Sequence, residues 1–316
     1  MTDSNVIEHC KDIAAIIVTY KPDLESFFRG LKAIARQVGH VIVVDNATGG
    51  MPIDRIEGEA RNAGIEARVI GMPRNEGLGT AINTGIDEAR SGGYPFVILF
   101  DQDSVPEAGM VARLKQTCHE LGSKGLRIAA VGPRFRAPES GSLSDFRNFI
   151  RGRVQLVRCA GLEGAVEAGF LISSGSFIPM KAIDAIGGMD ESLFIDHVDT
   201  EWCLRAKASG WGIYGVCDAV MEHSLGEHRQ RLWLWRWRHV SLHAPFRYYY
   251  IFRNSLLLRK RDNLPRDCSR AMLKRDIMLA IYLLFVPMNW RKNMKMIWRG
   301  VADGMRKVSG PMPGKG

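Results

Sequence analysis

Short apolar runs alternate with amphipathic stretches through the first hundred residues of the chain. The apolar runs are rich in β-branched residues and lack polar alternation, as is typical of strands buried on both faces of a parallel sheet. The stretches between them repeat their apolar residues at helical spacing. In chain order, the pattern predicts strands at 14–20, 41–45, 67–71 and 96–100, and helices at 24–38, 53–62 and 79–89.

This alternation of strands and helices predicts an α/β fold with a doubly wound, mostly parallel sheet. Ligands of such sheets collect beyond the carboxyl ends of the strands. The residues that end or follow three of the predicted strands, Thr19, Asp45 and Asp101, are therefore the first candidates for a functional site.

The second half of the chain is less regular. Residues 166–179 are expected to form a strand pair or a strand and turn, followed by a helix at 181–186 that Gly187-Gly188 ends. A further helix is predicted from near Asp199 to Ala208. The small and polar residues of 137–153 suggest a mobile loop that could act as a lid.

Charge divides the 316-residue chain near residue 226. The first 225 residues carry 23 Lys and Arg against 29 Asp and Glu, whereas residues 226–316 carry 20 against 5. We therefore expect two parts. Residues 1–225 would form the catalytic domain, and residues 226–316 would form a basic, aromatic-rich helical region. This asymmetry suggests an anionic partner surface, for which membrane lipid and nucleic acid both qualify.

The cysteines and the chain start indicate a cytoplasmic protein. None of the six cysteines has CxxC spacing, and we expect free thiols in a reducing compartment. The N-terminal residues lack the basic start and apolar stretch of a secretory signal. The longest apolar run, 277–290, contains Pro287 and falls short of the roughly 20 residues that span a bilayer.

Asp101-Gln102-Asp103 directly follows the apolar strand at 96–100, so two carboxylates emerge at the carboxyl edge of the sheet. Mg²⁺ or Mn²⁺ is held by such carboxylates together with substrate phosphates. An isolated Asp-x-Asp triplet is also common in turns and helix caps. The strand before it makes a cation site a serious alternative.

Two further polar segments lie near the same predicted edge. Asp45-Asn46 could accept a hydrogen bond from a nucleobase or form an Asx turn. The segment from Asn75 to Asn83 places two glycines before a helix, which allows close approach to a phosphate or ribose. It is not a Walker loop, and a purely structural glycine turn is the alternative reading.

The segment 194–202 concentrates acids just before a helix. Asp196, Asp199 and Glu201 lie within six residues, and crowded acids raise one another's pKa, as a general base requires. Asp199 could equally cap the helix, with Trp202 packing inward. His223 follows another apolar stretch and would complete a metal site if it met Asp103 in space.

In this order, these motifs resemble glycosyltransferase family 2, the inverting enzymes of the GT-A fold, and in particular its bacterial rhamnosyltransferase branch. The similarity covers roughly residues 13–255. Its marks are the segments 17–23, 43–46, 75–83, 100–104, 172–175 and 194–202, with Tyr249-Tyr250 and Arg253-Asn254. It implies donor contacts from Thr19, Asp45, Asn75, Asn83 and Asp101; a Mn or Mg site at Asp101, Asp103 and His223; Asp199 as catalytic base; and Asp196, Glu201 and Trp202 around the acceptor or in its supporting layer.

The resemblance also implies a reaction. An acceptor hydroxyl deprotonated by Asp199 would displace the nucleoside diphosphate with inversion. The Asp-Gln-Asp-Ser sequence and the 194–202 string favour dTDP-rhamnose as donor and a saccharide or polyprenyl-linked acceptor, in cell-surface polysaccharide synthesis. Processive members of the family carry Gln-x-x-Arg-Trp, whose spacing Gln230-Arg231-Leu232-Trp233 does not fit. We therefore expect addition of one or a few sugars.

The basic region suggests attachment to the inner face of the plasma membrane. Trp233, Trp235 and Trp237 alternate with arginines and precede the run 248–250 of tyrosines, a composition that suits an anionic leaflet. A packed helical subdomain or a dimer interface is the alternative. We expect no nucleic-acid partner, because nucleic-acid binding leaves the acidic site unexplained. Two other classes remain: a nucleotidyltransferase acting on sugar phosphates, and a binding protein without catalysis.

Overall fold

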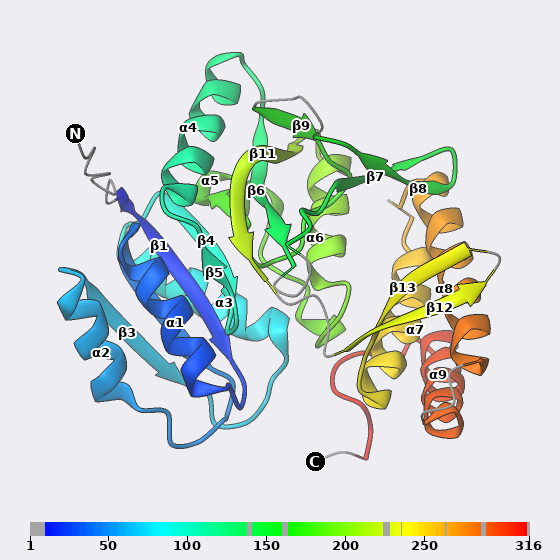
Figure 1. Cartoon of the computed structure of the whole chain (residues 1–316). Coiled ribbons are helices and arrows are strands. Elements are labelled where there is room, and N and C mark those ends of the chain that lie inside the picture. The colour runs from blue at the N-terminus through cyan, green and yellow to red at the C-terminus, as the bar shows by residue number, and fades with distance from the viewer. Residues whose placement is uncertain are drawn as a thin grey trace.

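The computed structural model describes residues 10–137, 141–159, 164–223, 228–234, 236–262, 264–285 and 289–314. In this part of the chain, helices cover both faces of a large mixed sheet, and the C-terminal helices lie together to one side of it (Figure 1). The predicted α/β class is confirmed.

The sheet is built from β1 (Cys10–Thr19), β2 (Val38–Asp45), β3 (Glu66–Gly71), β4 (Phe96–Asp101), β5 (Val105–Pro106), β6 (Ile128–Arg136), β9 (Ala165–Glu167), β10 (Phe177–Pro179) and β11 (Gly212–Glu222). The strand order is β3-β2-β1-β4-β10-β6-β11-β5, and β9 pairs with β11. The first four strands of this order are parallel, as are β6 and β11. β10, β5 and β9 run antiparallel to their neighbours. Of the alternatives for 166–179, a pair of strands bonded to each other is wrong, because β9 and β10 are both present but pair with other strands.

Two apolar cores lie on opposite faces of the sheet. α1 (Leu24–Ala35), α2 (Ile53–Asn62) and α4 (Met110–Ser123) cover one face, and α3 (Leu78–Ser91), α5 (Met180–Ile186) and α6 (Val198–Ala208) cover the other. Neighbouring residues of a strand point to opposite faces, so Ile16 enters one core and Ile17 the other. Both are buried, which explains why the strand sequences are apolar without alternation.

The C-terminal region is not wholly helical, which corrects the sequence prediction. β12 (His228–Leu234) and β13 (Arg236–Leu242) form an antiparallel hairpin ahead of α7 (Pro245–Arg259), α8 (Arg266–Leu284) and α9 (Trp290–Met305). The alternation of Trp and Arg has the period of two residues that a strand requires. That period was the signal for a hairpin.

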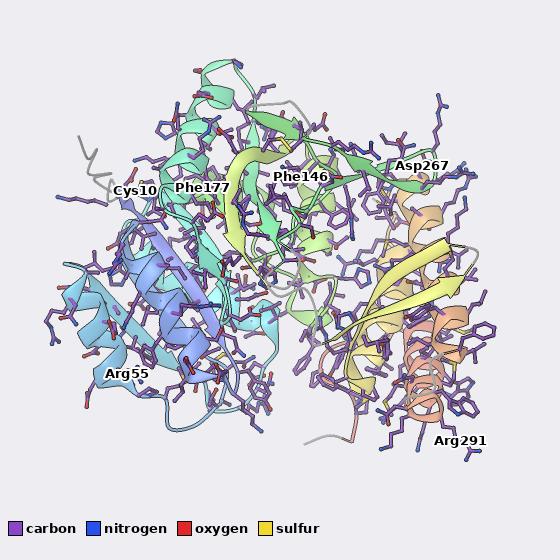
Figure 2. The ribbon with its side chains drawn as sticks, viewed as in Figure 1. Cys10, Arg55, Phe146, Phe177, Asp267 and Arg291 are labelled. Atoms are coloured by element: carbon purple, nitrogen blue, oxygen red, sulfur yellow. A yellow bond between two sulfur atoms is a disulfide. The ribbon has the colours of Figure 1, made fainter. Side chains whose placement is uncertain are left out.

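The tyrosine run is also placed differently from the expectation. Tyr248, Tyr249 and Tyr250 of α7 are buried. Tyr248 packs among apolar residues of α8 and α9, whereas the other two pack with Met312 near the C-terminus. Side chains fill the space between these helices (Figure 2). The run therefore forms the core of a packed subdomain and does not face a membrane.

A second hairpin takes the place of the second half of the expected mobile loop at 137–153. β7 (Phe146–Ile150) and β8 (Arg153–Val157) pair antiparallel, and the turn between them lies against α8, where Lys274 donates to the carbonyl of Gly152 at 3.4 Å. Residues 138–140 lie outside the described residues. Among the described helices, none combines the length and apolar character needed to cross a membrane.

Two of the cysteines correct the prediction of six free thiols. Cys159 and Cys217 form a disulfide between the segment after β8 and strand β11. They are 58 residues apart in sequence, and only the folded path brings their Cα atoms to 5.5 Å. The other four, Cys10, Cys118, Cys203 and Cys268, are free and buried.

Candidate functional site

The ends of three parallel strands define one edge of the site. In the pairing of β1 with its neighbours, Thr19 lies opposite Asp45 and Val18 opposite Asp101. The hydroxyl of Thr19 donates to Asp45 Oδ1 at 3.0 Å, and the amide of Thr48 donates to Asp45 Oδ2 at 3.0 Å. Both carboxylate oxygens of Asp45 are thus held in place at the sheet edge.

Asp101, Asp103 and His223 come together beside this edge. One possible ligand atom from each lies within 4.8 Å of the others. His223 Nε2 is 3.6 Å from Asp101 Oδ2, and Nδ1 is 3.4 Å from Asp103 Oδ1. Two carboxylates suit a hard divalent cation, and three protein ligands leave coordination positions for phosphate oxygens. The three residues therefore fit a Mg²⁺ or Mn²⁺ ion.

Two serines hold the group of Asp101, Asp103 and His223 in position. Ser174 Oγ accepts from the amide of Asp101 at 3.2 Å and lies 2.7 Å from Ser104 Oγ, which in turn lies 3.2 Å from His223 Nδ1. Both serines are buried. Ligating imidazoles commonly bond a second group through the nitrogen that faces away from the metal. The pair ties the imidazole to the end of β4, a support that the sequence prediction did not assign.

The acids and the imidazole shift one another's pKa. Burial raises the pKa of Asp101, with a further increase from the charge of Asp103 and opposition from His223 and Arg247. Burial alone would lower the pKa of His223, but its hydrogen bond with Asp103 and the two carboxylate charges outweigh burial and raise it. The cluster thus holds concentrated negative charge that a cation would neutralise.

Asp199 lies in the first turn of α6, and its charge interacts with those of Asp101 and Asp196. Burial raises the pKa of Asp199 to about 6, donation from the amide and hydroxyl of Thr200 opposes this, and the charges of Asp101 and Asp196 add to it. The N-cap of α6 is His197, so the alternative of Asp199 as the cap is wrong. A carboxylate with a pKa near neutrality can accept a proton from a hydroxyl group.

The backbone before α6 is conformationally costly. Phe194, Asp196 and His197 have φ of 65°, 63° and 65°, a region that side chains other than glycine seldom adopt. Such positions persist only where the surroundings enforce them, and they concentrate at functional sites. This loop sets the direction in which α6, and with it Asp199, enters the site.

Side chains of helix α7 hold this loop in its conformation. The fully buried amide of Asn254 donates to the carbonyls of Leu193, Ile195 and Asp196 at 2.8–2.9 Å. Arg253, also fully buried, donates to the carbonyl of Leu193 at 2.9 Å and to that of Gly310 near the C-terminus. Sequence reasoning quoted both residues as motif marks but assigned them no site role; two adjacent polar residues in an apolar helix were the available signal.

The glycine segment meets the same loop. Gly77 has φ of 92°, and a Cβ there would lie 2.6 Å from the carbonyl oxygen of Phe194. The next amide, of Leu78, donates to that oxygen. Asn75 Oδ1 accepts from Gly77 N and from the side chain of Asn46, which brings Asn75 beside the end of β2. Gly77 therefore permits a contact between loops on the two sides of the site.

Other predicted residues support the site from further away. Asn83 bonds the backbone of Met189 and the carboxylate of Glu191. Buried Glu201 is paired with Arg205 and Arg261, and buried Trp202 donates to the carbonyl of Gly187 at 2.8 Å. Asp196 is paired with Arg247 of α7 at 2.5 Å. Donor or acceptor contacts by these residues stay predictions.

Comparison with known proteins places the fold and site in context. The family model "Glycosyl transferase family 2" matches residues 15–136. A dTDP-rhamnosyl transferase, RfbF of Shigella flexneri, is 29% identical over 95% of this chain and 97% of its own length. An N-acetylglucosaminyl-diphospho-decaprenol L-rhamnosyltransferase of Mycobacterium tuberculosis is 26% identical over 67% of this chain and 76% of its own.

Solved structures share the architecture at low sequence identity. Residues 1–349 of TarS from S. aureus, crystallised with UDP-GlcNAc, superpose with a TM-score of 0.61 at 14% identity, covering 94% of this chain and 81% of that one. GalNAc-T7, crystallised with UDP, GalNAc and Mn²⁺, gives a TM-score of 0.54 at 13% identity, covering 67% and 43%. The sheet and its helices are therefore a GT-A fold.

Proposed function

Because this chain belongs to glycosyltransferase family 2, we propose that it is an inverting, metal-dependent rhamnosyltransferase with dTDP-rhamnose as donor. The glycosyltransferase activity follows from the family. The choice of sugar is supported by the Shigella relative, which aligns along nearly the whole of both chains and is named a dTDP-rhamnosyl transferase. The acceptor is proposed to be a hydroxyl of a saccharide or of a polyprenyl-linked saccharide, a class to which the Mycobacterium relative's name points.

The observation that supports the mechanism is that a candidate cation site and a candidate general base lie at the same edge of the sheet. Asp101, Asp103 and His223 form a group that suits a cation, and Asp199 has a pKa raised towards neutrality, chiefly by burial and further by the charge of Asp101. A divalent ion there would neutralise the charge of a departing diphosphate. The base and the leaving-group site are thus neighbours, as a single displacement requires.

Each residue has a defined part in this proposal. Asp199 takes the proton of the acceptor hydroxyl, whose oxygen attacks the anomeric carbon as the bond to the diphosphate breaks. Asp45, held by Thr19 and Thr48, accepts from the nucleobase. Asn75, which is bonded to Asn46, contacts the donor, while Asp196 and its partner Arg247 border the acceptor side.

The test is calorimetric titration of dTDP-rhamnose and UDP-GlcNAc into the protein, with Mn²⁺ or with EDTA. We expect dTDP-rhamnose to bind more tightly and only with the ion. Asp103→Asn should weaken this binding roughly tenfold or more. Asp184→Asn, which alters an exposed carboxylate of α5, is the matched control. Binding by Asp103→Asn equal to that of the unmodified protein would refute the metal assignment, and preference for the UDP sugar would refute the donor.

A further inference from the structure

Helix α8 exposes an apolar stripe that no described part of the chain covers. Ile277, Met278, Ile281 and Leu284 have exposed fractions of 50%, 57%, 49% and 55%. Residues at i, i+4 and i+7 lie on one face of a helix, so Ile277, Ile281 and Leu284 form a continuous row. The opposite face of α8 is buried against α7 and α9, through Tyr282 and Leu283 among others. This half of α8 therefore carries apolar residues on its buried face and also on its exposed face.

The hairpin β7–β8 extends this surface. Leu156 is 58% exposed and pairs across the hairpin with Arg147, whose pKa is lowered by burial and by the charge of Arg275 on α8. Val154 lies two residues away and so on the same face of the hairpin as Leu156. The hairpin turn rests on α8 at Gly152. The hairpin thus places further exposed apolar side chains beside the first half of α8.

Cations precede the stripe on α8 and follow it at the start of α9. Arg270 and Lys274 are exposed on the first half of α8, and exposed Trp290, Arg291 and Lys292 begin α9. Figure 2 shows Arg291 at the outer end of the C-terminal helices. Of the two acids of α8, Asp276 is buried and bonded to Ser255 and Arg275, whereas Asp267 in the first turn is half-buried.

We propose that the exposed faces of α8 and of hairpin β7–β8 form a docking surface for an anionic lipid bilayer. Apolar side chains flanked by Lys, Arg and Trp suit the headgroup boundary, where the apolar row enters the acyl region and the cations meet lipid phosphates. A soluble protein partner of the usual kind would not require the cationic border. The surface is separate from the site at the sheet edge and does not depend on the donor or reaction proposed above.

Vesicle flotation of the full chain tests this surface. Vesicles of phosphatidylcholine alone are compared with vesicles containing equal parts of phosphatidylcholine and phosphatidylglycerol. We expect binding to the anionic vesicles that weakens as salt is raised. The double variant Ile277→Glu, Ile281→Glu should reduce the partition coefficient roughly tenfold or more. Arg270→Gln and Lys274→Gln should each reduce it about fivefold on anionic vesicles.

The matched control is Ile53→Glu, Leu126→Glu, which places the same charges at apolar residues of similar exposure, 47% and 42%, on the sheet domain. It should float like the unmodified protein, and all variants should keep its melting temperature and its hydrolysis of donor in solution. Absence of flotation by the unmodified protein, or equal loss in the control, overturns the proposal. A dimer in sedimentation analysis that Ile277→Glu, Ile281→Glu dissociates would assign the surface to a second copy instead, and retention on DNA without flotation would assign it to nucleic acid.

Discussion

Replacing Asp199 by Asn is expected to make the fold more stable at neutral pH while removing transfer activity. The carboxyl group has a pKa of about 6 in the folded chain, against an ordinary value of 3.8, chiefly because of burial. The folded state therefore holds its proton more tightly than the unfolded chain does. Ionisation of Asp199 above this pKa costs folding free energy that the neutral amide of Asn does not incur.

The size and sign of the effect follow from proton linkage. Between pH 3.8 and 6 the folded state binds more protons, so the stability contributed by this group falls as pH rises through that window. At about 1.4 kcal/mol per pKa unit, the full cost is about 3 kcal/mol above pH 7. The same relation gives about 1.6 kcal/mol at pH 5. The gain from Asp199→Asn should thus halve between pH 8 and pH 5.

Urea unfolding of both proteins at pH 8 and pH 5, in EDTA, measures this difference. Asp190→Asn is the control of opposite sign, because the bonds of Asp190 to Ser192 and Arg261 outweigh its burial and lower its pKa. That variant should lose stability at pH 8. Transfer by Asp199→Asn should fall by a factor of about 100 or more, the usual contribution of a general base.

Two results would refute the reasoning. If Asp199→Asn were equally or less stable than the unmodified protein at pH 8, the carboxylate would not be held in a costly ionised state. If the variant kept most of its transfer rate while binding donor normally, Asp199 would not be the base. The first result bears on the electrostatics of the site and the second on its chemistry, so the two can fail separately.

Three further predictions concern the supports of the site. Thr200→Val removes a hydroxyl that stabilises the ionised form of Asp199, so the acid limb of the transfer rate against pH should move up by about half to one unit, whereas Thr200→Ser should not move it. Ser104→Ala removes one of the two partners of His223 Nδ1 and should weaken Mn²⁺-dependent nucleotide binding about tenfold, measured by calorimetry at unchanged melting temperature. Cys217→Ser should cost about 2–4 kcal/mol in urea unfolding, and a reductant should then have no additional effect.

The sheet domain could be predicted because its signals are local. The strands β1 to β4 are continuous apolar runs, and α2 was predicted with the bounds that the structure shows, Ile53–Asn62. The sequence alone could not show that His223 lies with Asp101 and Asp103; it predicted this group only if the fold brought the three residues together. It arises because β11 runs parallel to β6 and ends at the same edge as β4, a long-range pairing that no local pattern contains.

The remaining errors concern features that depend on burial and tertiary contacts, which the sequence pattern does not show. β7 and β8 are short and largely exposed, so they lack the apolar runs by which buried strands are recognised. The tyrosines of α7 look amphipathic in sequence, but whether they meet lipid or protein depends on which helices pack around them. The disulfide depends on the path of two distant segments.

The C-terminal region helps to hold the site together, a role that its composition does not suggest. The division near residue 226 separates the sheet from α7 in sequence, yet Asn254 and Arg253 bond the strained loop that leads into α6. The positive φ angles of Phe194, Asp196 and His197 persist where such partners enforce them, and these bonds fix the loop that leads to Asp199. Helix α7 therefore holds the loop before the proposed base, while its neighbour α8 carries the stripe proposed to dock on a bilayer. If both proposals hold, an acceptor carried on a lipid would meet Asp199 at a position set by the same helical unit that is proposed to bind the membrane.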